Sequence, residues 1–144
     1  MKGYKTISQR AKEANIAGLI AAILGIAIAW TIAWTIRPSL NVWDSVRHGL
    51  AHHLIAASIP VIGIKFRCND HWELYNYLRA SSSILTLRAA LDIAIIYCTH
   101  GSTTTIIAAI FVWVIFAFCA FVLNSKKVAQ EAKQEAQIAE TLYK

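Results

Sequence analysis

Four apolar runs separated by polar segments dominate the pattern of residues along the chain. They cover residues 16–36, 47–64, 81–99 and 104–123. A helix of about 20 apolar residues crosses the hydrocarbon layer of a bilayer, and only the second run, with an apolar core of about 24 Å, is slightly short. The pattern therefore predicts an all-α membrane protein, in which four transmembrane helices form an up-down bundle over residues 16–124.

Polar segments flank this membrane domain at both ends. Residues 1–15 are predicted to form a helix that begins in water, because Thr6-Ile7-Ser8-Gln9 fits the reciprocal capping box. Residues 125–144 alternate Gln, Glu, Lys and Ala and predict a solvated helical tail with a weak apolar edge. Both tails are expected to lie in the cytoplasm.

The distribution of basic residues supports this topology. With only two spans, the whole middle of the chain, including Arg37, Arg47, Lys65 and Arg88, would lie on the outer side. With four spans, the connection 65–79 returns to the cytoplasm beside the basic tails, as the positive-inside tendency requires. We therefore expect a multi-pass protein of the cell inner (plasma) membrane.

Composition agrees with a membrane protein and excludes several other classes. Hydrophobic residues make up 57% of the 144 residues and charged residues 15%, with a mean hydropathy of +0.49. The net charge of +6 has no basic cluster interleaved with aromatic residues, so no nucleic-acid partner is expected. The three cysteines lack metal or disulfide spacing, and no nucleophile elbow, phosphate loop or HExxH motif is present. We do not expect an enzyme.

Small residues form a stripe along the first run. Gly18, Ala22, Gly25, Ala29 and Ala33 recur at steps of three or four, so they share one helix face. Because lipid is as apolar as leucine, membrane helices associate through close approach, which small residues allow. The stripe predicts a helix-packing face, and we expect it to be the docking face for another subunit.

The second and third runs contain polar residues that affect how they would sit in a membrane. Pro60 predicts a kink, with Ser58 or a neighbouring helix satisfying the freed carbonyl. The second run would span with His52 and His53 near one membrane boundary, or would lie along the surface. The third helix is expected to be capped by residues 81–83, preceded by a polar connection in which Asp70 caps a short turn. The fourth run has no charge and is expected to face lipid.

Arg88 and Asp92 lie one helical turn apart inside the third apolar run. Two charges at the centre of a membrane helix cost on the order of 5 to 7 kcal/mol on insertion, so they need partners. One interpretation is an ion pair that locks the bundle or a subunit interface. The other is a proton or ion site with Asp92 as the titrating carboxylate.

A second group of polar residues has spacing compatible with metal binding. Asp44, His48 and His52 stack on one side of a helix, and the four-span topology brings His100 to the same outer end. Zinc, copper or a bis-histidine haem would each suit some of these ligands. Interfacial histidines that only form hydrogen bonds are the alternative.

These features favour a structural or assembly subunit of a larger membrane complex or homo-oligomer. Its partners would be the lipid bilayer and other membrane helices, and no cofactor is required. The first alternative is a small proton- or ion-coupled transporter or channel that uses Arg88 and Asp92. The second is an outer-face metal or haem-binding membrane protein.

Overall fold

The chain is all-helical over the residues that the computed structural model describes. These are residues 5–35, 42–98 and 101–142, with the backbone alone for 33–35 and 42–51. Five helices follow one another in this part: α1 (Ile7–Thr35), α2 (Val42–Arg67), α3 (His71–Cys98), α4 (Thr103–Leu123) and α5 (Lys126–Leu142). The all-α prediction is confirmed for these residues.

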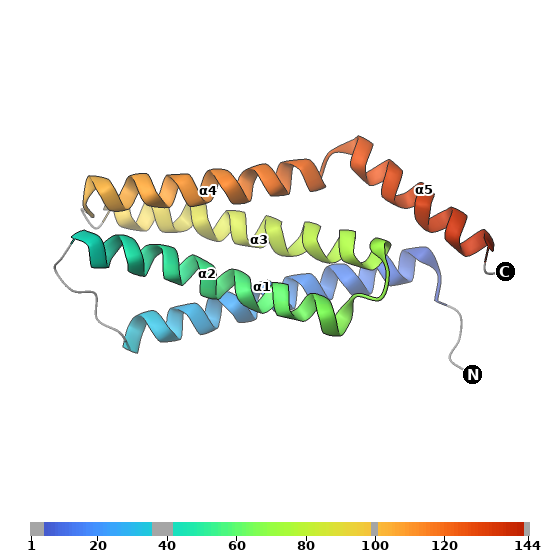
Figure 1. The fold of residues 1–144 in the computed structure, drawn as a ribbon, viewed down its shortest axis with the longest axis horizontal. Coiled ribbons are helices and arrows are strands. Elements are labelled where there is room, and N and C mark those ends of the chain that lie inside the picture. Colours follow the sequence, from blue (N-terminus) through green and yellow to red (C-terminus); the bar gives the residue numbers. More distant parts are fainter. Residues whose placement is uncertain (1–4, 36–41, 99–100, 143–144) are drawn as a thin grey trace.

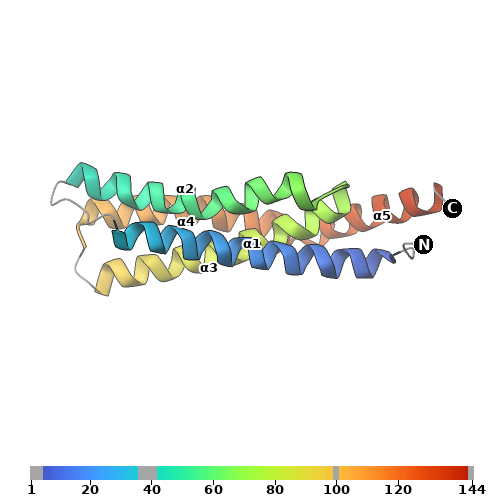
Figure 2. The ribbon, with the colours of Figure 1, turned by 90° about the horizontal axis from the view of Figure 1, so that it is seen from below.

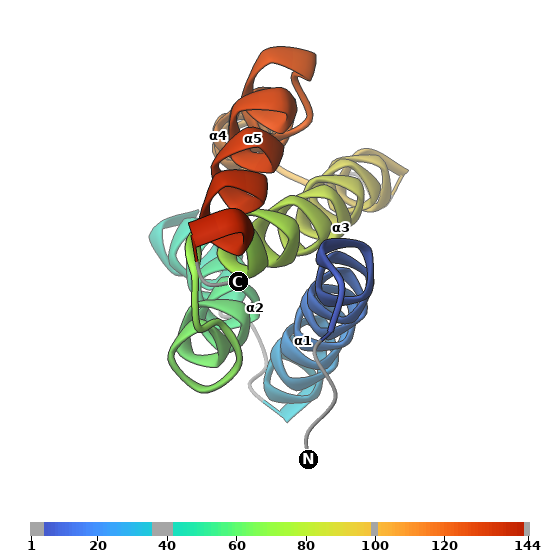
Figure 3. The same cartoon turned by 90° about the vertical axis from the view of Figure 1, so that its right-hand side faces the viewer.

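Helices α1 to α4 run side by side along the long axis, and α5 leaves the bundle at an angle (Figure 1). The start of α1, the α2–α3 connection and α5 lie at the same end in both side views (Figures 1 and 2). Seen end-on, α3 lies between α1 and α4, and it packs on both (Figure 3). We call the shared end, formed by residues 5–15, 64–80 and 124–142, the polar end.

Three helices are long and apolar enough to cross a membrane: the described part of α1 to Ile32, α3 and α4. Large apolar side chains are exposed on all of α1 to α4, for example Ile20 (60%), Leu54 (71%), Leu87 (68%) and Phe118 (67%). Soluble monomers rarely expose apolar surface of this extent, whereas lipid-facing helices must. The helices therefore have the length and the surface of a membrane-embedded protein.

The helix starts are set by side-chain caps. The predicted capping box at α1 is confirmed, because Thr6 and Gln9 exchange side-chain and backbone hydrogen bonds of 3.0 and 3.2 Å. Asp70 caps the whole of α3 rather than a short turn, since its Oδ1 accepts from the Glu73 N–H at 2.9 Å. α3 therefore begins ahead of the predicted start at residue 81.

The prediction that residues 81–83 cap the third helix is wrong. Ser81 donates to the carbonyl of Leu78, and both Ser82 and Ser83 donate to the carbonyl of Arg79. Hydroxyls inside a helix satisfy themselves on the preceding turn in this way, so they do not need to mark its start. The polar connection shrinks accordingly to residues 68–70.

The small-residue stripe of α1 lies inside the bundle. Ala22 and Ala29 are 0% and 1% exposed, and both belong to the apolar core with Ala56 and Leu85. A Cβ added at Gly18 would overlap the backbone carbonyl of Tyr77 in α3. Gly18, Ala22, Gly25 and Ala29 therefore pack on α2 and α3 of the same chain, whereas the side chain of Ala33 lies outside the described residues.

Gly25 faces the carbonyl that Pro60 leaves without a helical partner. Pro60 has no N–H, so the carbonyl of Ala56, four residues earlier, lacks its usual hydrogen bond. A Cβ at Gly25 would overlap that same carbonyl oxygen. Glycine therefore lets the backbone of α1 approach this carbonyl closely, and the Ser58 hydroxyl donates to the carbonyl of Ile55 instead.

Candidate functional site

Four ionisable side chains meet where α2 crosses α3. They are His52 and His53 of α2 with Arg88 and Asp92 of α3. The site lies within the apolar segment of α3 and about one helical turn from Ala56 and Leu85, which belong to the apolar core. We call these four residues the Arg88 cluster.

Arg88 is the centre of the cluster because its guanidinium contacts the other three side chains. Its Nη1 lies 3.1 Å from Asp92 Oδ2 and 3.3 Å from His53 Nδ1. Its Nη2 lies 2.8 Å from His52 Nε2 and also contacts Nδ1 of the same ring. Asp92 Oδ2 lies in turn 3.7 Å from His53 Nε2. The cluster therefore links α2 to α3 through every one of its members.

Donor and acceptor chemistry determines the charges in this arrangement. A guanidinium can only donate, so a ring nitrogen that faces it must accept and carry no proton. The Nδ1 atom of His53 faces Arg88, which leaves the proton of a neutral His53 ring on Nε2, toward Asp92. With both imidazoles neutral, the +1 charge of Arg88 is balanced by the −1 charge of Asp92.

The cluster is buried to different degrees across its members. The side chains of Arg88 and His53 are 7% and 8% exposed, whereas that of Asp92 is 16% exposed. The centroid of the Phe116 ring in α4 lies 6.3 Å from that of the His53 ring, so α4 packs beside the cluster at His53. Arg88 Nε is buried without a hydrogen-bond partner among the described residues. Asp92 is therefore more accessible than Arg88 or His53.

The ion pair expected from the spacing of Arg88 and Asp92 is present, and the two histidines extend it. His53 joins the pair although no sequence motif linked it to Arg88. Local spacing can pair two residues on one helix, but it cannot give the register of a second helix against the first. The feature of the sequence that pointed to further partners is the Arg88–Asp92 pair, because charged residues in an apolar helix need polar neighbours. The second run contains the histidines that can serve as such neighbours.

Only some of the proposed metal ligands belong to the part of the chain whose side chains the structure describes. The side chains of Asp44 and His48, and all of His100, lie outside the described residues. Both ring nitrogens of His52 lie against Arg88, so the one that carries no proton accepts from the guanidinium. No group of three potential metal ligands occurs among the residues that were described. The metal or haem site stays a prediction, and His52 is the one proposed ligand that the structure places elsewhere.

The two histidines lie in the middle of the bundle rather than near one of its ends. The sequence suggested that a spanning second helix would place them at a membrane boundary. Arg88 supplies the reason for the difference, because its donors give both imidazoles hydrogen-bonding partners deep among apolar helices.

A line of buried polar residues runs along α3 from the polar end toward the cluster. Glu73, Tyr77 and Ser81 are 7%, 1% and 2% exposed and follow one another at steps of four. The hydroxyl of Tyr77 donates to the carbonyl of Pro60 at 2.7 Å, which ties α3 to α2. Leu85, 7% exposed, lies on the same face before Arg88 is reached. Buried polar residues of α3 therefore begin at Glu73, ahead of the apolar run that starts at residue 81.

The polar end is held by ion pairs of a different kind. Arg10 of α1 pairs with Asp70, and Arg67 lies 3.4 Å from Glu13 and 3.8 Å from Glu73. Lys5 adds a 2.7 Å contact to Glu13. The side chains of Glu13 and Asp70 are 42% and 39% exposed, so water screens the pairs that these two carboxylates form, whereas Glu73 is buried. They align the ends of α1, α2 and α3.

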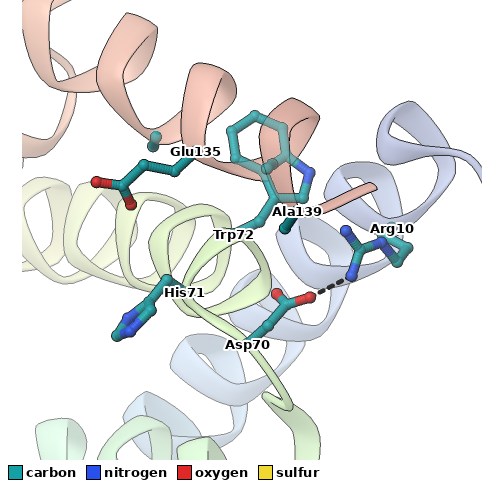
Figure 4. A pocket seen from close by; sticks show the side chains of 8 residues that line it. Arg10, Asp70, His71, Trp72, Glu135 and Ala139 are labelled. Carbon is teal, nitrogen blue, oxygen red and sulfur yellow. Dashed lines mark hydrogen bonds and ion pairs between the residues drawn. The ribbon is translucent and has the colours of Figure 1, made fainter. Parts of the chain in front are cut away.

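A small cavity of about 130 Å³ lies between α5 and the starts of α1 and α3. Figure 4 shows Arg10 and Asp70 paired across it, with Trp72 beside Ala139 of α5. Trp72 donates its indole N–H to the carbonyl of Ile7 at 3.0 Å. The arginine that lines this cavity is already paired with Asp70, and Glu135 is the other charged residue of the lining.

Cys68, in the connection between α2 and α3, behaves as a structural residue. Burial raises the pKa of its thiol above the ordinary value, and the neighbouring Glu73 carboxylate acts in the same direction. A protonated thiol is a poor nucleophile and a poor metal ligand. The structure therefore gives no reason to assign chemistry to this cysteine.

Comparison with known proteins adds no relationship: no family model matches the chain, and no match was found among curated proteins or solved structures. The class of protein therefore follows from its helices, three of which can span a membrane. Its function must be argued from the Arg88 cluster.

Proposed function

We propose that this is a four-span membrane protein that moves an ion across the bilayer, with the Arg88 cluster as its site. The observation that supports this most is the meeting of four ionisable side chains from two helices within apolar surroundings. Ionisable groups at that depth are expensive and are found mainly on ion and proton pathways. The subunit function expected from the sequence loses its main support, because the small-residue stripe is covered within the chain.

The proposal includes α2 as the fourth span. α2 packs along α1 and α4 and lies beside them in the bundle (Figure 2). Its outward residues Leu54, Val61 and Ile62 are 57–71% exposed, as a lipid-facing surface would be. Four spans place the polar end, with the basic residues of both tails, on the cytoplasmic side of an inner membrane.

A purely structural ion pair explains less of the cluster. Arg88 and Asp92 already neutralise each other across one helical turn. The two imidazoles add ionisable groups that an apolar pair of residues on α2 would not, and each has a ring nitrogen that can exchange a proton. The polar line of Glu73, Tyr77 and Ser81 continues toward the cluster from the side of the polar end.

Ion flux through purified protein in liposomes tests the proposal. We expect the wild-type protein to dissipate an imposed ion gradient, and Asp92→Asn to lower the rate about ten-fold or more, since the amide keeps the shape but not the charge. Asp70→Asn is the matched control, because it makes the same change in a carboxylate that pairs with an arginine at the polar end. A wild-type protein without flux, or equal flux from Asp92→Asn, would reject the proposal.

A second candidate function is an assembly subunit, and α5 is the observation that favours it. This helix leaves the bundle and exposes Ile138 (61%) and Leu142 (78%), whereas Ala136 faces inward at 5%. Its outer surface is otherwise polar, as expected of a helix in water that can meet a cytoplasmic partner.

Copurification from native membranes distinguishes this candidate. The full chain would arrive with stoichiometric neighbours, and the double change Ile138→Glu with Leu142→Glu would release them. Gln137→Glu is the control, since it adds a negative charge to an exposed position of the same helix. Recovery of the wild-type chain alone from mild detergent would remove the subunit function.

A further inference from the structure

We propose that the ion is a proton and that Asp92 is the group that takes it up. The inference rests on the proposed function, and it names the ion that this site can accept. The inference follows from the contacts that the lone pairs and charges of the Arg88 cluster already make. These contacts disfavour a metal cation and an anion for separate reasons.

A metal cation has no place in the cluster as it is arranged. The imidazole nitrogens of His52 and the Nδ1 atom of His53 face the guanidinium of Arg88. The lone pairs that a metal ion would need, one on each neutral ring, therefore lie against Arg88, which is a permanent positive charge. A metal ion would have to displace the guanidinium and would then be repelled by it.

An anion is disfavoured because Arg88 already has a carboxylate partner. Its Nη1 lies 3.1 Å from Asp92 Oδ2 on the same helix, and its Nη2 is engaged by His52. An incoming anion would compete with a carboxylate that is covalently held one helical turn away. It would also bring a second negative charge beside Asp92, where like charges repel.

A proton needs only one lone pair, and Asp92 offers it. Every polar contact of Asp92 among the described residues uses Oδ2, and its side chain is about twice as exposed as those of Arg88 and His53. Residues 14–32 of α1 and Thr103–Leu123 of α4 contain no charged residue, and in α2 the side chains of Asp44, Arg47 and His48 lie outside the described part of the chain. The charged and titratable groups described around Asp92 are therefore Arg88, His53 and His52.

Uptake at Asp92 would change how α2 is held to α3. The proton forms an O–H bond on the carboxylate and later returns to water on the opposite side, so no other reactant is needed. While it is bound, Arg88 loses its counter-charge, and the Nε2 proton of His53 no longer faces a carboxylate. The Arg88–Asp92 pair lies within α3, so the contact between the helices that weakens is that of His53 with Asp92, and its loss gives a bound proton a means to shift α2 against α3.

The test uses liposomes that contain a pH-sensitive dye and carry a potassium diffusion potential set with valinomycin. We expect the wild-type protein to let the potential drive protons across the membrane while potassium leaves through valinomycin to balance their charge. Sodium flux, and potassium flux measured without valinomycin, should equal those of protein-free liposomes. Asp92→Asn should slow the proton flux about ten-fold or more. Asp70→Asn should leave it unchanged.

The outcomes separate this inference from the proposed function. Sodium, potassium or chloride flux without proton movement would overturn the inference and leave the proposed function in place. The absence of any protein-dependent flux would overturn both. Infrared spectroscopy gives a second measurement, in which the wild type and Asp70→Asn should show a pH-dependent band of a protonated carboxyl that Asp92→Asn lacks. The band in Asp92→Asn at wild-type intensity would exclude Asp92 as the acceptor.

Discussion

The polar end and the Arg88 cluster both join helices through an arginine and an aspartate, but in opposite surroundings. At the polar end Arg10 and Asp70 are 26% and 39% exposed, and water screens their attraction. In the cluster Arg88 and Asp92 are 7% and 16% exposed, and two imidazoles complete the shell. The difference shows that water can replace a lost partner at the polar end, whereas nothing replaces it in the bundle.

Removal of Arg88 is the most damaging change that this comparison predicts. Arg88→Ala leaves Asp92 buried beside apolar helices without its counter-charge, and breaking a buried pair in this way costs about 3–5 kcal/mol. The unfolding midpoint in mixed detergent should fall accordingly. Arg79→Ala is the control, because Arg79 is an arginine of the same helix whose guanidinium lies over the Tyr75 ring at the polar end. Equal losses from the two variants would show that burial of Arg88 does not matter.

The close approach of α1 and α2 should be the next most sensitive feature. Gly25→Leu inserts a side chain where even a Cβ would overlap the Ala56 carbonyl oxygen, and such overpacking costs about 1–3 kcal/mol or more. Ala27→Leu adds a similar side chain to an exposed position of the same helix and should be tolerated. The same unfolding assay distinguishes them, and a tolerated Gly25→Leu would contradict the packing of α1 on α2.

A smaller effect is expected where a single buried hydroxyl links two helices. Tyr77→Phe removes the hydrogen bond to the Pro60 carbonyl but keeps the ring, which is 1% exposed. Interhelical hydrogen bonds in membrane proteins average about 0.6 kcal/mol, so the midpoint should shift slightly. Tyr97→Phe, at an exposed position of α3, should cause no shift. A loss as large as that of Arg88→Ala would mean that Tyr77, not the cluster, holds α2 to α3.

The polar end should respond least. Arg10→Ala removes the Asp70 pair at a cost below about 1 kcal/mol, because the pair is exposed and screened. High salt should remove most of the difference from the wild type, whereas it should not reduce the effect of Arg88→Ala. Unfolding midpoints in low and high salt measure both. A large, salt-independent loss in Arg10→Ala would erase the contrast between the two regions.

The sequence predicts those parts of the fold that depend on local chemistry. The capping box of Thr6 and Gln9, the apolar runs and the Arg88–Asp92 pair each involve residues within one helical turn. The start of α3 was misplaced because hydroxyls such as Ser81 can bond inside a helix as well as cap it. Asp70, which does cap α3, has the same preference for a cap, and local sequence does not rank the two.

Features that depend on the register between helices could not be read from the sequence. The small-residue face of α1 indicates close packing, but not whether α2, α3 or another subunit covers it. The same holds for the Arg88 cluster, since the contact of His53 with Arg88 depends on how α2 packs in the bundle, including its close approach to Gly25 at Ala56. Helix packing, rather than any motif, assembled the candidate site.

Exchange of the two charges tests most directly whether the cluster does more than hold helices together. Arg88→Asp with Asp92→Arg restores an ion pair one turn apart but removes the carboxylate from beside His53. Our account predicts that the double exchange regains stability relative to either single change and still fails to move ions in liposomes. Recovery of wild-type ion flux together with stability would contradict it, because the position of Asp92 would then be immaterial.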